Sequence, residues 1–241
     1  MKKIIIVGHS DSLLQKENGH KIDSFDIVVR MSEGKIKGYE KYVGTKTDVC
    51  RIVWENHFSL ILDNKGNERF IFKNTEQTGF KTLLLTHFVD VDNFSETAMH
   101  YAKIYKHGGM YDMNTKWVKR RRSVTAATGM NPRITHDIFL DIFLQLHPYV
   151  KNISIINRNI KISTAQSICN GTTYTFPSNG IYTINHMIDS YPNDQIYITG
   201  FDGFKNKHYF KTYETCTKWH DSMREQLFLK RLLKTDRVNL L

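Results

Sequence analysis

Short, continuous apolar runs recur along the chain, and each is bounded by charged residues or glycine. Runs of this kind predict strands that are buried on both faces, which is typical of a parallel sheet. The first run, Lys3 to Gly8, contains four consecutive apolar residues and is expected to be a central strand. Further strands are expected at residues 25–30, 48–54, 82–86, 152–157 and 195–199.

Between these runs, apolar residues recur at helical spacing. Helices are expected at residues 95–106 and 131–146, and a third begins after Pro177. Strands that alternate with helices predict an α/β fold with a mainly parallel sheet. We find no repeat, low-complexity tract or linker, so residues 1–241 are expected to form a single domain.

The helix after Pro177 has the clearest start in the chain. Ser178 or Asn179 can cap it, and Gly180 would let a ligand approach the backbone. The N–H groups at such a helix start attract phosphate. The strand at 195–199 follows and ends in Gly200-Phe201-Asp202. An ordinary helix cap without a ligand is the alternative interpretation.

Gly8, His9 and Ser10 follow the first strand, at the end where open α/β sheets bind ligands. This segment lacks the Gly-x-Gly-x-x-Gly pattern of dinucleotide-binding proteins, so we infer no NAD site.

A second polar cluster lies near the C-terminus. His208 stands in an aromatic loop, and His220 stands just ahead of the last helix. Ser222 and Glu225 match a capping box at the start of that helix. The two histidines could serve as a base and a phosphate partner. Because the chain has 11 histidines, either could also be incidental.

The net charge of +10 indicates an anionic partner such as a nucleotide, nucleic acid or acidic membrane surface. The basic run from Lys116 to Arg122 is either a solvated surface or a docking site for such a partner. Three widely spaced cysteines favour a reducing compartment. We find no run long enough to be a signal sequence or a membrane span, so a cytoplasmic location is expected, including a peripheral one on a membrane.

Together, these segments resemble the sialyltransferases of glycosyltransferase family 29. Residues 4–10, 25–31 and 38–47 are similar to that family's long donor-binding motif, and residues 177–181 with 196–201 to its short motif. His208-Tyr209-Phe210 is similar to the third motif, and His220 with Glu225 to the final His-x-x-x-x-Glu. A weaker likeness to family 42 sialyltransferases covers the Gly-x-x-x-Ser segment at 8–12 and the Ser-x-Gly helix start at 178–180.

The resemblance implies a sialyltransferase-type variant of the GT-A fold, with a Rossmann-like sheet. It implies inverting, metal-independent transfer of sialic acid from a CMP-sugar to a glycan hydroxyl, with no cofactor. His220 would be the general base and His208 the partner of the departing phosphate, whereas Glu225 would be structural. The donor would be held by residues at the strand ends and the helix start: Gly8, His9, Ser10, Arg30, Ser32, Ser178, Asn179, Gly180, Gly200, Phe201 and Asp202.

The chain departs from the family pattern at two donor-site positions. His9 and Ser32 stand where the family usually has asparagines that contact the nucleotide or its phosphate. Both can still donate hydrogen bonds, so the donor pocket is altered rather than lost. The cysteine pair of the animal enzymes is also absent, which favours a microbial or viral enzyme in the cytosol.

Three other functions are compatible with the sequence. Transfer of Kdo or another nonulosonate from its CMP-activated form would use the same motifs. A non-catalytic nucleotide-binding module is a second alternative. A basic nucleic-acid-binding protein would explain the charge, but the sequence has no recognisable nucleic-acid motif, so we expect no nucleic-acid partner. The acceptor and its linkage cannot be read from the sequence.

Overall fold

The structure is a computed structural model. It describes residues 1–31, 34–52, 58–62, 68–72, 80–85, 152–156, 158–169, 177–203, 205–210 and 220–241. The predicted helices at 95–106 and 131–146, the basic run at 116–122 and Ser32 lie outside the described residues.

The chain forms two compact units. The first comprises Met1–Phe58, Lys73–His87 and Tyr149–Leu241, and the second comprises Ser59–Phe72 and Phe88–Pro148. A two-stranded sheet of β4 (Phe58–Leu62) and β5 (Glu68–Phe72) belongs almost wholly to the second unit. These two strands were not predicted from the sequence, and the expected single domain stays a prediction.

The first unit contains a seven-stranded sheet in which every neighbouring pair is parallel. Its strand order is β7-β6-β3-β2-β1-β8-β9. The strands are β1 (Lys3–Val7), β2 (Ile27–Met31), β3 (Val49–Ile52), β6 (Thr82–Leu85), β7 (Asn152–Ile155), β8 (Gln195–Thr199) and β9 (Val238–Leu240). The six expected strands are confirmed, and their expected bounds lie within two residues of the bounds in the structure. Strand β9 was not predicted.

Strand β1 lies in the interior of the sheet, between β2 and β8. Ile4, Ile5 and Ile6 have no exposed surface. Because side chains alternate along a strand, Ile4 and Ile6 enter the hydrophobic cluster on one face of the sheet, and Ile5 and Val7 enter the cluster on the other. Four consecutive apolar residues are therefore what this position requires.

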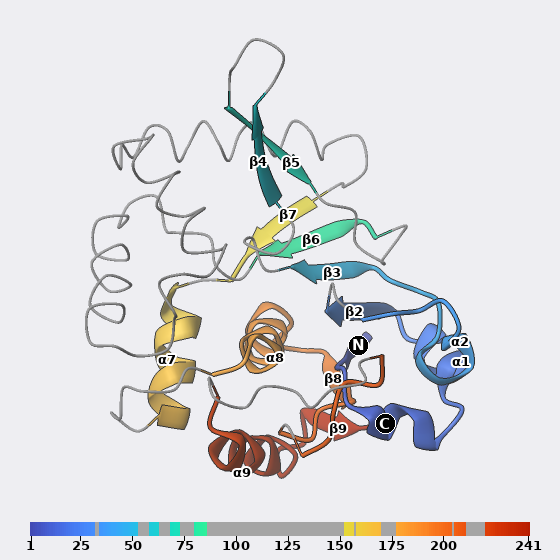
Figure 1. Cartoon of the computed structure of the whole chain (residues 1–241). Coiled ribbons are helices and arrows are strands. Elements are labelled where there is room, and N and C mark those ends of the chain that lie inside the picture. Colours follow the sequence, from blue (N-terminus) through green and yellow to red (C-terminus); the bar gives the residue numbers. More distant parts are fainter. Residues whose placement is uncertain are drawn as a thin grey trace. The chain divides into compact units, whose positions relative to one another are not determined.

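Helices cover both faces (Figure 1). On one face lie α7 (Arg158–Cys169), α8 (Asn179–Ser190) and α9 (Ser222–Leu232). On the other lie the 3-10 helix η1 (Asp11–Gln15), α1 (Gly19–Asp23) and α2 (Glu40–Val43). Residues 38–47, part of the long donor-binding motif, thus contain a helical turn, and α7 was not predicted. No helix among the described residues is long and apolar enough to span a bilayer.

Helix α8 begins as the sequence predicts. Ser178 is its N-cap residue, and Ile181, Ile184 and Met187 are buried along one side. Their spacing of three residues turns them toward the sheet, where they pack in the same cluster as Ile4 and Ile6 of β1. Packing against the sheet therefore orients the start of α8.

Candidate active site

The order in which strands are added to the sheet reverses between β1 and β8. The strands that follow β1 are added on one side of it, whereas β8 and β9 lie on the other side. Ligands of open α/β sheets bind outside the carboxyl ends of the strands at such a switch point. Gly8-His9-Ser10 leaves β1 here and Gly200-Phe201-Asp202 leaves β8, as the sequence analysis expected.

The two segments are joined closely by their backbones. The Gly8 N–H donates to the Thr199 carbonyl at 2.8 Å, and the Ser10 N–H donates to the Gly200 carbonyl at 3.0 Å. A Cβ atom at Gly8 would lie 2.2 Å from the Gly200 carbonyl oxygen. Gly8 is therefore needed for the approach of two protein segments, whether or not a ligand also lies there.

Ser10 and Asp202 link the same segments through their side chains. The Ser10 hydroxyl donates to Asp202 Oδ2 at 2.8 Å and accepts from the Ser12 N–H at 3.1 Å. Asp202 Oδ2 also accepts from the Asn206 N–H at 3.0 Å. Ser10 is almost fully buried. Both side chains thus have structural partners, and their predicted donor contacts stay predictions.

His9 and His208 are neighbours. Residues 207–209 pair antiparallel with residues 9–11, through an N–H···O bond from Tyr209 to His9 at 2.9 Å and one from Asp11 to Lys207 at 3.0 Å. The His9 and His208 rings meet edge to face, with centroids 4.9 Å apart. The two imidazoles that the sequence placed in separate motifs therefore share one cluster.

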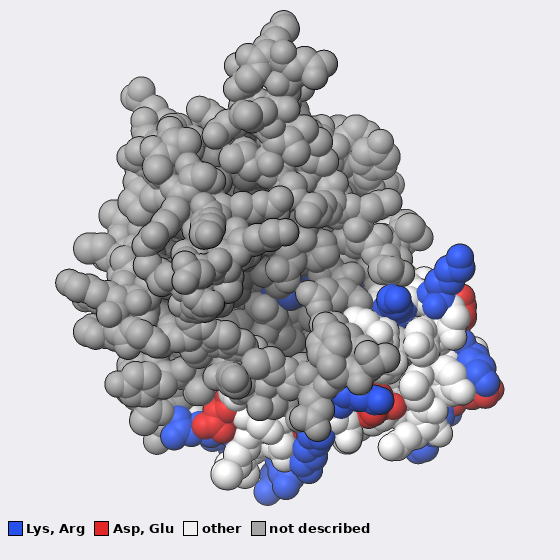
Figure 2. Space-filling view, viewed as in Figure 1, with Lys and Arg blue, Asp and Glu red and all other residues white. Residues whose placement is uncertain are grey.

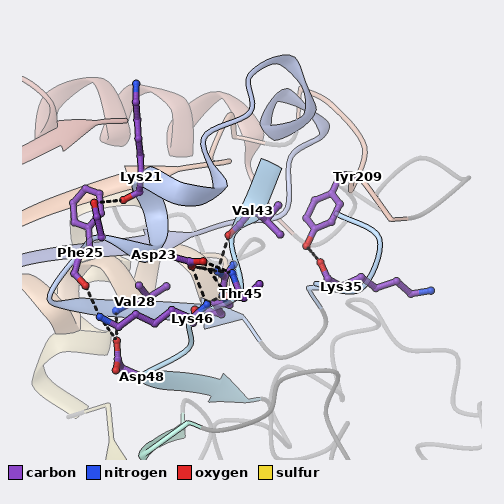
Figure 3. A network of polar contacts seen from close by, with 12 residues as sticks. Lys21, Asp23, Phe25, Val28, Lys35, Val43, Thr45, Lys46, Asp48 and Tyr209 are labelled. Atoms are coloured by element: carbon purple, nitrogen blue, oxygen red, sulfur yellow. Dashed lines mark hydrogen bonds and ion pairs between the residues drawn. The ribbon is translucent and has the colours of Figure 1, made fainter. Parts of the chain in front are cut away.

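Aromatic rings extend this cluster toward the loop after β2. The Phe210 ring centroid lies 5.1 Å from that of His9 and 5.5 Å from that of His208. The buried Tyr209 donates its hydroxyl hydrogen to the Lys35 carbonyl (Figure 3). A Cβ atom at Gly34 would lie 3.0 Å from His9 Nε2. Segment 208–210 therefore binds the loop after β2 to the end of β1.

Arg30, near the end of β2, donates hydrogen bonds to carbonyl groups at the end of α2 and in the segment that follows it. Its Nη2 donates to the Val43 carbonyl at 2.6 Å and its Nε to the Lys46 carbonyl at 2.8 Å. Burial lowers the pKa of Arg30 to about 10, while Tyr209 and Asp23 act in the opposite direction. These contacts assign the guanidinium a structural role, and a role in donor binding stays a prediction.

Asp23 binds the segment that follows α2 (Figure 3). Its carboxylate accepts hydrogen bonds from the Thr45 N–H at 2.8 Å and the Lys46 N–H at 2.9 Å. It also lies 3.9 Å from Arg30 Nη2. Asp23 was not predicted, because no local pattern connects it with Thr45, which lies 22 residues later in the chain.

The start of α8 is bound to α9 by a buried carboxyl group. Glu225, which is 2% exposed, accepts from the Ser178 N–H at 2.5 Å and from the Ser178 hydroxyl at 2.8 Å. The same hydroxyl accepts from the Ile181 N–H at 3.4 Å. The donors of Ser178 are thus directed to Glu225, and its predicted contact with the nucleotide stays a prediction.

The predicted capping box at α9 is wrong. Asp221 is the N-cap residue, and its carboxylate accepts from the Arg224 N–H at 3.0 Å. The Ser222 hydroxyl donates to the Gly203 carbonyl at 2.5 Å, and Glu225 is directed to Ser178 instead of back to Ser222. The Ser178 N–H and hydroxyl give the buried carboxyl group two hydrogen bonds, whereas a capping box would give it one.

Burial raises the pKa of Glu225 to about 7. The two hydrogen bonds from Ser178 favour the ionised form and limit this rise, whereas the charge of Asp221 adds to it. The α8–α9 contact therefore depends on a carboxyl group that titrates near neutral pH.

Asn179 and Gly180 follow Ser178 at the start of α8. The Asn179 Oδ1 atom is buried, and it has no hydrogen-bond partner in the described part of the chain. A Cβ atom at Gly180 would lie 2.6 Å from Cε1 of Phe201. Gly180 therefore makes room for the Phe201 ring, a reason that the sequence analysis did not anticipate.

His220 is half-buried and directly precedes Asp221, the N-cap residue of α9. The expected position just ahead of the last helix is confirmed. Because Ser222 contacts Gly203 and Glu225 contacts Ser178, the start of α9 is fastened both to the loop after β8 and to α8. Among the described residues, no group of three or more His, Cys, Asp or Glu side chains could hold a metal ion.

Known sialyltransferases share sequence with this chain. Type 2 lactosamine alpha-2,3-sialyltransferase of Homo sapiens is 32% identical over 96 residues, which are 39% of this chain and 29% of that protein. CMP-N-acetylneuraminate-beta-1,4-galactoside alpha-2,3-sialyltransferase of Homo sapiens is 48% identical over 46 residues, which are 19% of this chain and 12% of that protein. The matched stretches thus span less than a third of these relatives.

Solved structures share the fold. The crystal structure of a mammalian sialyltransferase superposes with a TM-score of 0.55 at 17% identity, covering 100% of this chain and 68% of that one. A mammalian sialyltransferase in complex with Gal-beta-1-3GalNAc-ortho-nitrophenol gives 0.54 at 16% identity, covering 100% and 69%. These likenesses confirm the expected fold.

The family model described as glycosyltransferase family 29 (sialyltransferase) matches residues 1–237. Because this match takes in nearly the whole sequence, the chain belongs to glycosyltransferase family 29, the family of the sialyltransferases.

Proposed function

We propose that this chain transfers sialic acid from a CMP-activated donor to a hydroxyl group of a glycan acceptor, with inversion and without a metal ion. The observation that carries the proposal is the convergence of three of its family's motifs around the switch point of the sheet. The segment after β1, the segment after β8 and His208 meet there. The start of α8 meets them through Gly180 and Phe201.

The start of α8 is suited to hold an anionic donor. The N–H groups of Asn179 and Gly180 have no carbonyl partner within their own helix, so they favour a phosphate or carboxylate. The buried Asn179 Oδ1 atom would accept from a ribose hydroxyl or the cytosine amino group of CMP. Ser178 positions the start of the helix through its two hydrogen bonds to Glu225.

His220 is the proposed general base. It takes the proton from the acceptor hydroxyl, whose oxygen then forms a bond to the anomeric carbon of the sugar. The bond from that carbon to the CMP phosphate breaks, and its electron pair leaves with the phosphate. Histidine is the side chain that most often takes this role in enzymes.

His208 is the proposed partner of the departing phosphate. A hydrogen bond from its ring would stabilise the negative charge that develops on the leaving group. His9 is the rival for this role, because its ring lies beside that of His208 and it replaces a family asparagine.

The experiment that tests the reaction begins with calorimetric titration of CMP. CMP-N-acetylneuraminate, CMP-Kdo and other CMP-nonulosonates are then offered with a panel of glycan acceptors, in EDTA, and the products are identified by mass spectrometry. We expect saturable CMP binding and transfer from CMP-N-acetylneuraminate. Transfer from CMP-Kdo alone would favour the second donor class.

Two results would contradict the enzyme. CMP binding without any single-turnover cleavage of a CMP-sugar would indicate a non-catalytic nucleotide-binding module. Salt-dependent retention on DNA without saturable CMP binding would indicate a nucleic-acid-binding protein. Loss of transfer in EDTA that Mg²⁺ restores would contradict metal independence but not the reaction itself. The cytoplasmic location stays a prediction.

A further inference from the structure

The outer face of α9 combines exposed apolar and basic side chains. Met223 is 72% exposed and Leu227 is 52% exposed. They are four residues apart, so they lie one above the other on the helix. Lys230 and Lys234, which are exposed, continue the same line toward and beyond the C-terminus of the helix. We call these four residues the α9 outer face.

The opposite side of α9 explains why this line faces outward. Phe228 and Leu229 are buried in the core, and Leu232 and Leu233 pack against it. Glu225 is buried against Ser178. The inward side therefore takes the residues that the fold needs, and Met223 and Leu227 have no core position to occupy.

The local charge on α9 is positive. Arg231 is exposed beside the outer face and donates from Nη2 to the Ser167 carbonyl at 3.2 Å. Of the nearby acids, Asp221 caps the helix and pairs with Arg224 at 3.3 Å, and Asp236 is exposed. Figure 2 shows Lys and Arg side chains along the lower margin of the molecule, where α9 lies.

We propose that the α9 outer face docks on an anionic lipid bilayer. Apolar side chains that project among cations are the pattern of helices that lie in a membrane interface, where the apolar groups enter the headgroup boundary and the cations meet acidic lipids. A soluble polyanion would use the lysines but would not require Met223 and Leu227 to be exposed.

Docking on this face would deliver a lipid-linked acceptor to the site. His220 lies three residues before Met223, at the same end of α9. A bilayer that contacts Met223 would therefore present its glycan headgroups near the proposed base. This part of the inference rests on the proposed function, whereas docking itself does not.

Co-sedimentation of the full chain with phosphatidylcholine vesicles that contain about 30% phosphatidylserine tests the docking. We expect binding at low salt that weakens with added salt, and little binding to pure phosphatidylcholine. The double variant Lys230→Gln/Lys234→Gln should bind roughly 25-fold more weakly, since each cation near such a surface is worth about fivefold. Met223→Ser/Leu227→Ser should weaken binding by at least about tenfold.

The matched control is Lys16→Gln/Lys21→Gln. It removes the same charge from exposed lysines beside the helices on the other face of the sheet, and it should leave vesicle binding unchanged. Melting curves of all variants should match that of the parent, because none of these side chains is in the core.

Three results would overturn the proposal. They are no binding to the acidic vesicles at low salt, equal losses in the α9 and control variants, and binding that is insensitive to Met223→Ser/Leu227→Ser. The readout uses no CMP-sugar, so an inactive chain that binds vesicles would contradict the proposed function alone. An active chain that does not bind them would contradict the docking alone.

Discussion

Two junctions hold the candidate site together, and different interactions stabilise them. The junction of β1 with β8 and with residues 207–210 is made by backbone hydrogen bonds and close packing. The junction of α8 with α9 is made by the carboxyl group of Glu225, which accepts both donors of Ser178. The first depends on shape, whereas the second depends on protonation.

This difference separates the two proposed catalytic histidines. His208 belongs to the junction that is fixed by backbone pairing. His220 stands at the start of the helix that carries the titrating carboxyl. We therefore expect the position of His220 to respond to pH and that of His208 to stay constant.

The largest expected effect is on the rate of transfer. His220→Ala should lower turnover by about a hundred- to ten-thousand-fold, because a general base is lost, and CMP should still bind. His208→Ala should slow transfer and also weaken CMP binding, because its proposed role is to hydrogen-bond the phosphate. Steady-state kinetics and calorimetry on both variants check this.

The pH profiles sharpen the assignment. The acidic limb of the rate profile should disappear in the His220 variant and remain in the His208 variant. If His9→Ala reproduces the His208 phenotype and His208→Ala is mild, His9 is the phosphate partner. Near-native turnover in His220→Ala would show that the family mechanism does not operate here.

The next effect is on the backbone junction. Gly8→Ala should lower the free energy of unfolding by about 3 kcal/mol, since its Cβ would lie 2.2 Å from a backbone oxygen that cannot easily move. Gly38→Ala is the control: its φ is +87°, but no atom lies within 4 Å of the added Cβ. It should cost only about 1–2 kcal/mol, the usual cost of a left-handed backbone for a residue with a Cβ atom. Denaturant titration compares them, and equal losses would mean that packing at Gly8 is not the cause.

The protonation of Glu225 should be visible in the pH dependence of stability. Its folded-state pKa of about 7 lies above the ordinary value of 4.5, so the folded protein binds the proton more tightly. The stabilisation is complete below pH 4.5 and is lost as pH rises through 7. The total is on the order of 3 kcal/mol.

Glu225→Gln removes this titration. Between pH 5 and 8, the free energy of unfolding of the parent should therefore fall relative to that of the variant. Only the difference is informative, because burial also lowers the pKa of His186, which acts in the opposite direction. Denaturant titrations at each pH measure it, and parallel curves for the two proteins would refute the role of Glu225.

The smallest expected effect concerns the contact of Gly180, at the start of α8, with the Phe201 ring, which follows β8. Gly180→Val should cost about 1–3 kcal/mol and weaken CMP binding, because its Cβ would displace the Phe201 ring. A side chain can move more easily than a backbone, so the protein should still fold. In the background of Phe201→Ala, the stability cost of Gly180→Val should largely vanish. If the cost persists there, Phe201 is not what the glycine accommodates.

The sequence by itself determined six of the seven strands of the parallel sheet and the start of α8, but not β4, β5, β9 or α7. Runs such as Ile4 to Val7 can be strands only where both faces are covered, and they predicted the parallel sheet. Pro177 and Ser178 marked the start of α8, and the position of His220 just ahead of α9 was also foreseen. These features depend on neighbouring residues, so a short window of sequence contains them.

Only the tertiary structure decided which groups meet. Ser178 and Glu225 are 47 residues apart in the chain, and Gly180 and Phe201 come from a helix start and a strand end. No periodicity connects such pairs. The capping-box prediction was wrong for the same reason. The sequence pattern of Ser222 and Glu225 is present, but the buried Glu225 carboxyl group accepts hydrogen bonds from Ser178, which packing brings next to it. The partners of buried polar groups are therefore a property of the assembled layers.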